Sequence, residues 1–372
     1  MKIIQKVKKP NGRRQIYLGG VKVFSYKRSK GATPPCTQNV DKTINFLPNS
    51  YYGKIYIPPY PEIKISNSIP EIYNKDGDKM DIFFLRDENS MHAPYMHMSK
   101  YFLWDRFNIG LDTHFYAHKA ILEKMGNPNK AYGLFIETES IIPNEYAIFK
   151  THKGIEKEFN SILTYSDELL NTLDNAIFYN GLSQVWYGQE IRDGVRDPVK
   201  ISPDAHKLKN KNISMICSDK LMCKMHYVRH EIAKEALKSN KVDIFGKFNN
   251  KPITFKSEAL KDYRFQIVVE NDIKPYNWTE KIMDCFASQT IPIYVGAPKI
   301  GQFFNLDGII NASELVEHPE NLAKILKNCT AEEYENRLEA IKDNYERSLE
   351  YLNADDCLYE LLFKEERERP TQ

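Results

Sequence analysis

RFQIVVENDIKPYNWTEKIMDCFASQTIPIYVGAP, Arg264 to Pro298, joins two apolar runs through a polar loop and a helical pattern. The first run, Arg264–Val269, has the length and the branched and aromatic residues of a buried strand. The stretch from Thr279 to Gln289 has apolar residues at helical spacing, and Ile291–Val295 is a second strand. A strand, a helix and a strand in this order predict a parallel sheet covered by helices.

The same alternation extends over most of the chain and predicts two α/β halves. In the C-terminal half, further strands are predicted at residues 213–218 and 242–246, with a helix over 226–239. In the N-terminal half, short apolar runs predict strands at residues 81–86, 131–137 and 161–166, and a helix is predicted from Thr113 to Met125. The polar segment from Tyr187 to Asn212 is interpreted as a linker with loops, and the break between the halves is placed near residues 180–210.

The two ends of the chain complete the predicted domain organisation. Arg13–Arg28 alternates around a Gly-Gly pair and predicts a β-hairpin, while residues 51–75 are irregular. From Ala331 onward, apolar residues recur at helical steps and predict one long helix. We therefore expect an appendage over 1–50, α/β domains over 51–195 and 196–330, and a helix over 331–372.

Composition excludes several classes of protein. With 372 residues, 42% hydrophobic content and a net charge of only +2, the chain is globular and lacks the basic excess of a general nucleic-acid binder. Its six cysteines include no Cys-x-x-Cys pair, and His114 and His118 lack a metalloprotease pattern, so we expect neither a metal site nor a disulfide framework. No run of about 18 apolar residues occurs, and no signal sequence is recognised.

The scattered cysteines and the lack of a recognised signal sequence favour the cytoplasm, where cysteines stay reduced. Basic residues among the first 30 positions leave open a peripheral contact with the anionic inner membrane, although a solvated hairpin explains them equally well.

Polar residues stand where the strands of the opening stretch end. Open α/β sheets bind ligands outside the carboxyl ends of their strands, which places Glu270-Asn271 and Thr279-Glu280-Lys281 on the same rim. Two such halves facing a cleft suggest a nucleotide-sugar transferase of the GT-B type.

Charges at the start of the predicted helix indicate a phosphate ligand. Glu280 alone is explained by its favourable interaction with the helix dipole, and Asn271 alone by a turn. Lys281 at a helix start is unfavourable unless an anion lies there, and a diphosphate would supply that anion. Glu280 would then accept hydrogen bonds from ribose or sugar hydroxyls. Arg229 is interpreted either as a solvated helix residue or as a clamp on the same phosphates.

Two acids follow a strand in the N-terminal half. Glu137 and Glu139 are either loop residues or the source of a general base facing the cleft. Transfer by direct displacement needs one such group to take the proton of the acceptor hydroxyl.

Several motifs together resemble glycosyltransferase family 10, the α-1,3/4-fucosyltransferases. The stretch with Glu-Asn, a short loop, Thr-Glu-Lys and Gly-Ala-Pro resembles the signature of that family, and VDIFGKF and MICSDK…YVRHEI resemble two more of its segments. This match covers roughly residues 211–311, and ETESIIPNEYAIF is a weaker match in the N-terminal half. Three positions depart from the pattern of the family. Asn277 stands where the family has a tyrosine, although the residue before it is Tyr276. Val269 stands in place of a phenylalanine, and Asp272 stands in place of the serine or threonine that follows the asparagine.

The resemblance implies a role for each matching residue. The donor would be held by residues of the C-terminal half: Ser218, Arg229, Asn271, Tyr276, Thr279, Glu280 and Lys281. Glu139 would be the catalytic base, with Glu137 as the second choice. No cofactor and no metal are implied, and the donor would be a nucleotide diphosphate sugar, with GDP-fucose as the first choice.

The predicted function is therefore an inverting fucosyltransferase that acts in the bacterial cytoplasm on a surface-glycan precursor, either a glycan or a glycolipid. One alternative keeps the fold and uses another nucleotide sugar. Another is a non-catalytic glycan-binding or scaffold protein.

Overall fold

The computed structural model describes residues 4–8, 13–18, 21–27, 71–74, 76–87, 99–192 and 194–367. The chain divides into two compact units, Met1–Asn45 and Phe46–Gln372. The first unit holds an antiparallel sheet of β1 (Ile4–Lys8), β2 (Arg13–Leu18) and β3 (Val21–Lys27). The pairing of β2 with β3 confirms the predicted hairpin.

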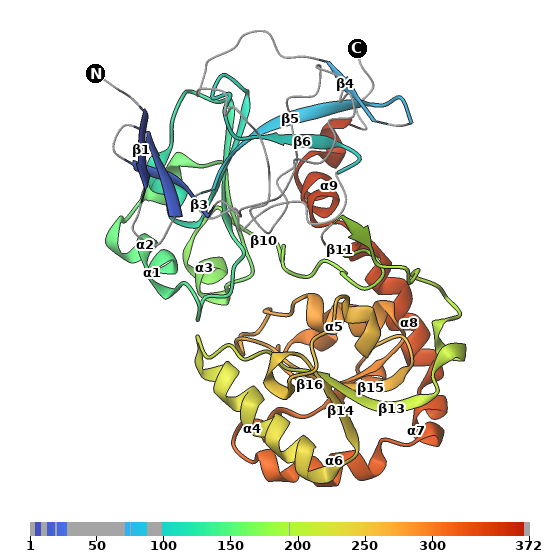
Figure 1. The fold of residues 1–372 in the computed structure, drawn as a ribbon. Coiled ribbons are helices and arrows are strands. Elements are labelled where there is room, and N and C mark those ends of the chain that lie inside the picture. Colours follow the sequence, from blue (N-terminus) through green and yellow to red (C-terminus); the bar gives the residue numbers. More distant parts are fainter. Residues whose placement is uncertain are drawn as a thin grey trace. The chain divides into compact units, whose positions relative to one another are not determined.

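The second unit begins with a seven-stranded sheet, the N-terminal sheet (Figure 1). Six of its strands are parallel in the order β6-β5-β7-β8-β9-β10, and β4 pairs antiparallel with β5. Predicted strands 81–86, 131–137 and 161–166 are confirmed as β5, β8 and β9. The bounds are β4 (Ile72–Tyr73), β5 (Lys79–Arg86), β6 (Phe102–Asp105), β7 (Thr113–Ala117), β8 (Lys130–Phe135), β9 (Ser161–Thr164) and β10 (Ala176–Phe178).

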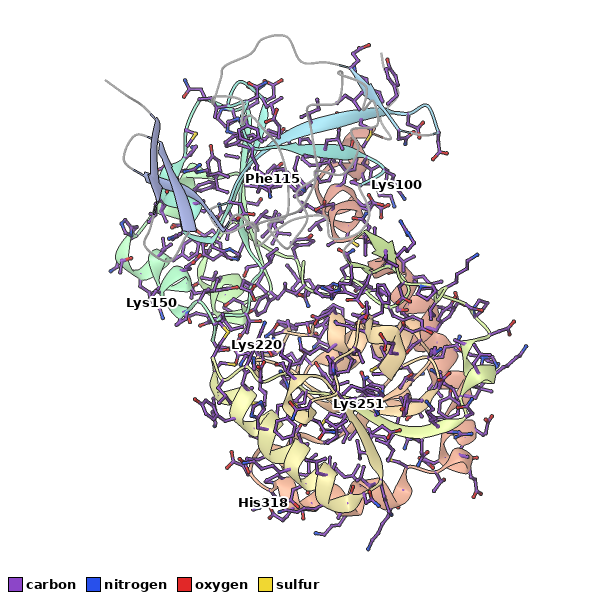
Figure 2. The ribbon with its side chains drawn as sticks, viewed as in Figure 1. Lys100, Phe115, Lys150, Lys220, Lys251 and His318 are labelled. Carbon is purple, nitrogen blue, oxygen red and sulfur yellow. The ribbon has the colours of Figure 1, made fainter. Side chains whose placement is uncertain are left out.

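The helix predicted from Thr113 to Met125 is wrong. This stretch forms strand β7 and then a 3-10 helix, His118–Glu123. Phe115, labelled in Figure 2, packs on one side of the sheet and Tyr116 on the other, and both are fully buried. A strand buried on both faces is apolar at consecutive positions, so its residues can match a helical spacing by chance.

Short helices cover the second face of the N-terminal sheet. They are α1 (Pro143–Tyr146), α2 (Ile148–Thr151) and α3 (Asp167–Thr172), and they contribute Tyr146, Ile148 and Leu169 to a core with Phe84 and Tyr116.

The C-terminal sheet has five parallel strands in the order β14-β13-β15-β16-β17. All its predicted strands and both predicted helices are confirmed. Helices α4 and α6 cover one face, and α5 covers the other. The bounds are β13 (Lys211–Ile216), α4 (Lys224–Ser239), β14 (Val242–Phe245), β15 (Tyr263–Val269), α5 (Glu280–Ala287), β16 (Ile291–Val295), β17 (Ile310–Asn311) and α6 (Leu322–Asn328).

The single long helix predicted from Ala331 is also wrong. The chain forms α7 (Ala331–Asn336), α8 (Leu338–Ser348), a 3-10 turn and α9 (Ala354–Arg367). Helix α8 packs against α5, whereas α9 returns to the N-terminal sheet (Figure 1). Leu358 and Phe363 of α9 are buried there against Phe83. The segment serves two cores, so its helices must change direction.

The segment from Tyr187 to Asn212 is more ordered than a linker. It includes the antiparallel pair β11 (Ile191–Arg192) and β12 (Val195–Arg196). Glu190 and Asp197 are buried and bonded to the 3-10 helix that starts at Lys256: Glu190 accepts from the Lys256 amide, and Asp197 accepts from the Ser257 hydroxyl. Its polar residues therefore satisfy buried groups of the C-terminal domain.

The predicted α/β class with two Rossmann-like domains is thus confirmed by the strand order, and this is the GT-B type of fold. In the C-terminal sheet the order reverses between β13 and β15, which is where open α/β sheets bind ligands. Among the described residues, no helix is both long and apolar enough to cross a membrane.

Candidate active site

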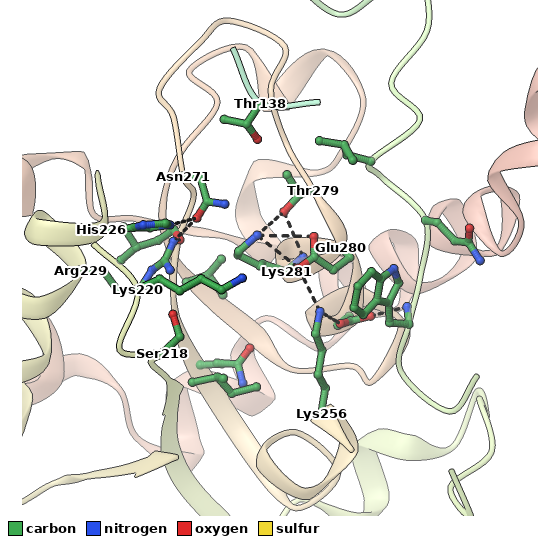
Figure 3. Close-up of a pocket in the computed structure, with 18 of the residues that line it drawn as sticks. Thr138, Ser218, Lys220, His226, Arg229, Lys256, Asn271, Thr279, Glu280 and Lys281 are labelled. Carbon is green, nitrogen blue, oxygen red and sulfur yellow. Dashed lines mark hydrogen bonds and ion pairs between the residues drawn. The ribbon is translucent and has the colours of Figure 1, made fainter. Parts of the chain in front are cut away.

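A cavity of about 440 Å³ opens at the carboxyl ends of β13 and β15 (Figure 3). Glu137 and Thr138, which follow β8, line it from the N-terminal domain. The C-terminal domain contributes residues that follow β13 and β15, together with the starts of α4 and α5. The cavity therefore lies at the point where the strand order of the C-terminal sheet reverses.

A buried carboxylate fixes the start of α5. Glu270 follows β15 and is completely buried. Its Oε1 accepts from the backbone N–H of Thr279 at 3.0 Å and its Oε2 from the Thr279 hydroxyl at 2.7 Å. Thr279 is the N-cap of α5, and its hydroxyl also accepts from Nζ of Lys281 at 2.9 Å. Nζ of Lys281 lies 3.6 Å from Glu270 and 3.2 Å from Glu280.

This arrangement corrects the electrostatic reason given for Lys281. We expected an external anion to balance a cation at the helix start, but the protein supplies one in Glu270. The Thr279 hydroxyl then accepts a weak bond from the Lys281 amide at 3.4 Å, so two donors of the first turn have partners within the chain. The start of α5 is therefore a preassembled charge cluster.

Asn271 is held from α4. Its Oδ1 accepts from Nη2 of Arg229 at 2.6 Å and from Nε2 of His226 at 3.1 Å. Nδ1 of His226 accepts from the Met222 amide, and burial followed by the charge of Arg229 lowers the pKa of His226, so this ring is neutral near pH 7. These bonds fix Oδ1, and the Nδ2 group of Asn271 is turned away from Arg229 (Figure 3).

A second charge cluster extends from Glu280. Nζ of Lys256 lies 3.1 Å from Oε1 of Glu280 and 3.1 Å from Oδ2 of Asp284. The other oxygen of Asp284 accepts from the amides of Trp186 and Tyr187. Although burial alone raises the pKa of Glu280, Lys256 and Lys281 bring it well below its usual value. Glu280 is therefore ionised throughout the physiological range.

Lys220 differs from the other cations of the cavity wall in its exposure to solvent. It is exposed, it follows β13, and its side chain extends into the cavity (Figure 3). Within the described part of the chain, no ion pair involves it.

The two candidate bases differ in position. Glu137 lines the cavity and is 8% exposed, and burial raises the pKa of its carboxyl group. Glu139 does not line the cavity, and its Oε2 lies 3.2 Å from Nζ of Lys274. Tyr146 and Tyr165 donate to the carbonyl of Glu137, which holds this turn in place.

The structure therefore brings together six of the seven residues expected to hold the donor, together with the second-choice base. The donor residues that line the cavity are Ser218, Arg229, Asn271, Thr279, Glu280 and Lys281. Tyr276 does not line it. Its ring packs against Phe178, and its hydroxyl accepts from Lys299.

Residues of the cavity wall that sequence reasoning missed include Trp186, Arg192, Lys220 and Lys256. Lys220 could have been found, because it stands two residues after Ser218 at a strand end. Trp186 and Arg192 lie near or within the segment that resembled a linker, and no pattern marks Lys256.

Among the described residues, no group of three or more His, Cys, Asp or Glu side chains could hold a metal ion. His114 and His118 lie on β7 and on the following 3-10 helix, so they do not share the helix face that was considered for them.

A comparison with protein families decides the nature of the C-terminal domain. Residues 206–352 match the model described as glycosyltransferase family 10 (fucosyltransferase), C-terminal part. This region of the chain is thus similar to the C-terminal domain of family 10 glycosyltransferases. The resemblance found over residues 211–311 is thereby confirmed.

One curated relative is the α-(1,3)-fucosyltransferase FucT of Helicobacter pylori, which is 38% identical over 66 residues. The match spans 18% of this chain and only 14% of the length of that enzyme. Among solved structures, an α1,3-fucosyltransferase with GDP-fucose covers 82% of this chain and 95% of its own at 16% identity, with a TM-score of 0.40.

A glycosyltransferase from Rickettsia africae covers 69% of this chain and 78% of its own at 15% identity, with a TM-score of 0.41. These superpositions are loose.

Replacing Thr279 tests the Glu270 cluster. Thr279→Val removes the hydroxyl that donates to Glu270 and accepts from Lys281, and should destabilise the protein by about 2 kcal/mol because a buried charged acceptor loses a donor. Thr279→Ser keeps the hydroxyl and should cost no more than about 0.8 kcal/mol for the lost methyl group. Urea unfolding of both variants measures the difference, and equal midpoints would show that the hydroxyl does not matter.

Proposed function

We propose that this protein transfers fucose from GDP-fucose, with inversion at the anomeric carbon, to a hydroxyl group of a glycan or glycolipid acceptor. The cavity between the two domains would hold the donor. The single observation that carries this proposal is the exposed ammonium of Lys220, which forms no ion pair within the described residues. It extends into a cavity already fixed by the clusters around Glu270 and Asn271 (Figure 3).

The charges of the cavity wall fit a diphosphate. Three carboxylates line it, those of Glu137, Glu280 and Asp284, and His226 is neutral. Five cationic side chains also line it: Arg192, Lys220, Arg229, Lys256 and Lys281. Arg192, Lys256 and Lys281 are already paired with carboxylates, whereas Lys220 and Arg229 form no ion pair within the described residues. The positive charges of Lys220 and Arg229 suit the two negative charges of a nucleotide diphosphate sugar.

Each group in the cavity has a proposed role. Lys220 would bind the diphosphate directly. Lys281 and Arg229 would add positive charge to the wall of the cavity. Such fixed charges stabilise the departing diphosphate, because its negative charge increases in the transition state. Glu280 and the Nδ2 group of Asn271 would orient the ribose or the sugar, and Ser218 lies at the same rim.

Glu137 is the proposed base. Inversion requires the acceptor to attack from the face opposite the diphosphate, and Glu137 lines the cavity from the opposite domain. Its raised pKa suits a group that must take a proton near neutral pH. Glu139, the first choice from the sequence, is held by Lys274 and now becomes the second.

A second candidate function keeps this chemistry with another nucleotide sugar. It is favoured by Asn277, which replaces the expected tyrosine and is completely buried next to the donor cavity residue Thr279. For the location we propose the bacterial cytoplasm, because the five cysteines that the structure describes are all free.

A nucleotide panel tests the donor. GDP and GDP-fucose should raise the melting temperature of the protein, whereas UDP and CDP should not, because ligands stabilise the state that they bind. Lys220→Met should remove most of the GDP shift. Stabilisation by UDP or CDP alone would favour the second candidate, and no shift with any nucleotide would contradict the proposed function.

A pair of isosteric variants tests the base. Glu137→Gln should lower kcat by about 100-fold or more, since general base catalysis contributes at least that much. In the wild type, the rate should fall as pH drops through the raised pKa of Glu137, so the acidic limb should lie above pH 4.5. Glu139→Gln serves as the matched control and should retain that limb. The reverse result, with only Glu139→Gln inactive, would assign the base to Glu139.

A further inference from the structure

The ammonium of Lys256 is enclosed by partners. Its Nζ lies 3.1 Å from Glu280, 3.1 Å from Asp284 and 4.2 Å from the centre of the Trp186 ring. An ammonium group has three N–H donors, and here two carboxylates and an aromatic face account for them. The side chain is only 18% exposed, although it lines the cavity.

Because of this enclosure, Lys256 and Lys220 differ in how available their ammonium groups are to a phosphate. Both lysines line the same cavity, but the charge of Lys256 is already balanced by carboxylates at contact distance. A phosphate would have to displace those carboxylates in order to bind it. Lys256 must therefore affect a ligand mainly through the groups that it holds.

The most direct of these groups is Glu280. Its Oε1 receives Lys256 at 3.1 Å and Lys281 at 3.2 Å. Lys281 is the next residue of the same helical turn, so it cannot fix the Glu280 carboxylate relative to elements outside α5. Lys256 comes from another element, the 3-10 helix Lys256–Ala259, and so fixes the carboxylate from outside α5.

Lys256 is itself held in place by the segment between the domains. Its backbone N–H donates to Oε2 of Glu190 at 2.7 Å, and Glu190 is completely buried. Glu190 also forms an ion pair with Arg192, another residue of the cavity wall. Both residues lie outside the matched residues 206–352.

We propose that Lys256 is a positioning residue that fixes the carboxylate of Glu280 in the orientation needed to accept hydrogen bonds from the donor. This inference rests on the proposed function, in which Glu280 contacts the ribose or the sugar. It makes the segment between the domains part of the donor site, because Glu190 holds the lysine that holds Glu280.

A double-mutant cycle tests the coupling. GDP-fucose binding is measured by calorimetry for the wild type, Lys256→Met, Glu280→Gln and the double variant. Each single variant should bind about tenfold more weakly, and the double variant should be no weaker than Glu280→Gln alone, because residues that act as one unit are not additive. Lys256→Arg keeps the charge and should bind more tightly than Lys256→Met.

Three results would overturn the proposal. An unchanged affinity in Lys256→Met would show that the lysine does not matter. A loss that is equally large in the Glu280→Gln background would mean that Lys256 contacts the donor directly. No recovery of affinity in Lys256→Arg would show that the charge is not what counts.

Two controls keep these outcomes distinct. Lys234→Met removes an exposed lysine of α4 that pairs with Glu231, and it should not change the affinity. Because Lys256→Met leaves buried carboxylates uncompensated, the cycle is repeated in an Asp284→Asn background if the first variant does not fold. Failure of the wild type to bind GDP-fucose would contradict the proposed function, whereas binding with an additive cycle would contradict only the role of Lys256.

Discussion

The completely buried carboxylate of Glu270 is the interaction on which the site depends. An ionised group without partners would be costly to bury, so the backbone N–H and hydroxyl of Thr279 and the ammonium of Lys281 must stay beside it. The end of β15 and the start of α5 are thereby held at a fixed separation. These three contacts of Glu270 fix the position of the first turn of α5.

Neighbouring backbone is shaped by the same carboxylate. A Cβ atom at Gly296 would overlap the side chains of Tyr294 and Glu270, so the glycine of the Gly-Ala-Pro sequence leaves room for them. The hydroxyl of Tyr294 accepts from the Ala297 amide, which fixes the turn after β16. The residues around Glu270 and those around Gly296 thus pack directly against each other.

The sequence predicted the C-terminal domain well because its strands and helices have clear apolar patterns and its polar residues stand at strand ends. It failed at Thr113–Met125, where burial on both faces hid the strand, and after Ala331, where one apolar pattern serves two cores. At the site, it found the residues of α4 and α5 that belong to recognisable motifs. Lys256 and Glu190 act through contacts made between distant segments, which no local pattern reveals.

The central claim is that the cavity at the ends of β13 and β15 holds a nucleotide diphosphate sugar. A crystal structure of the protein with bound GDP tests it most directly. The diphosphate should lie within hydrogen-bond distance of Nζ of Lys220, with the ribose or phosphate next to the Glu280 and Asn271 side chains. Density for GDP at another place, with Lys220 still facing solvent, would contradict this account.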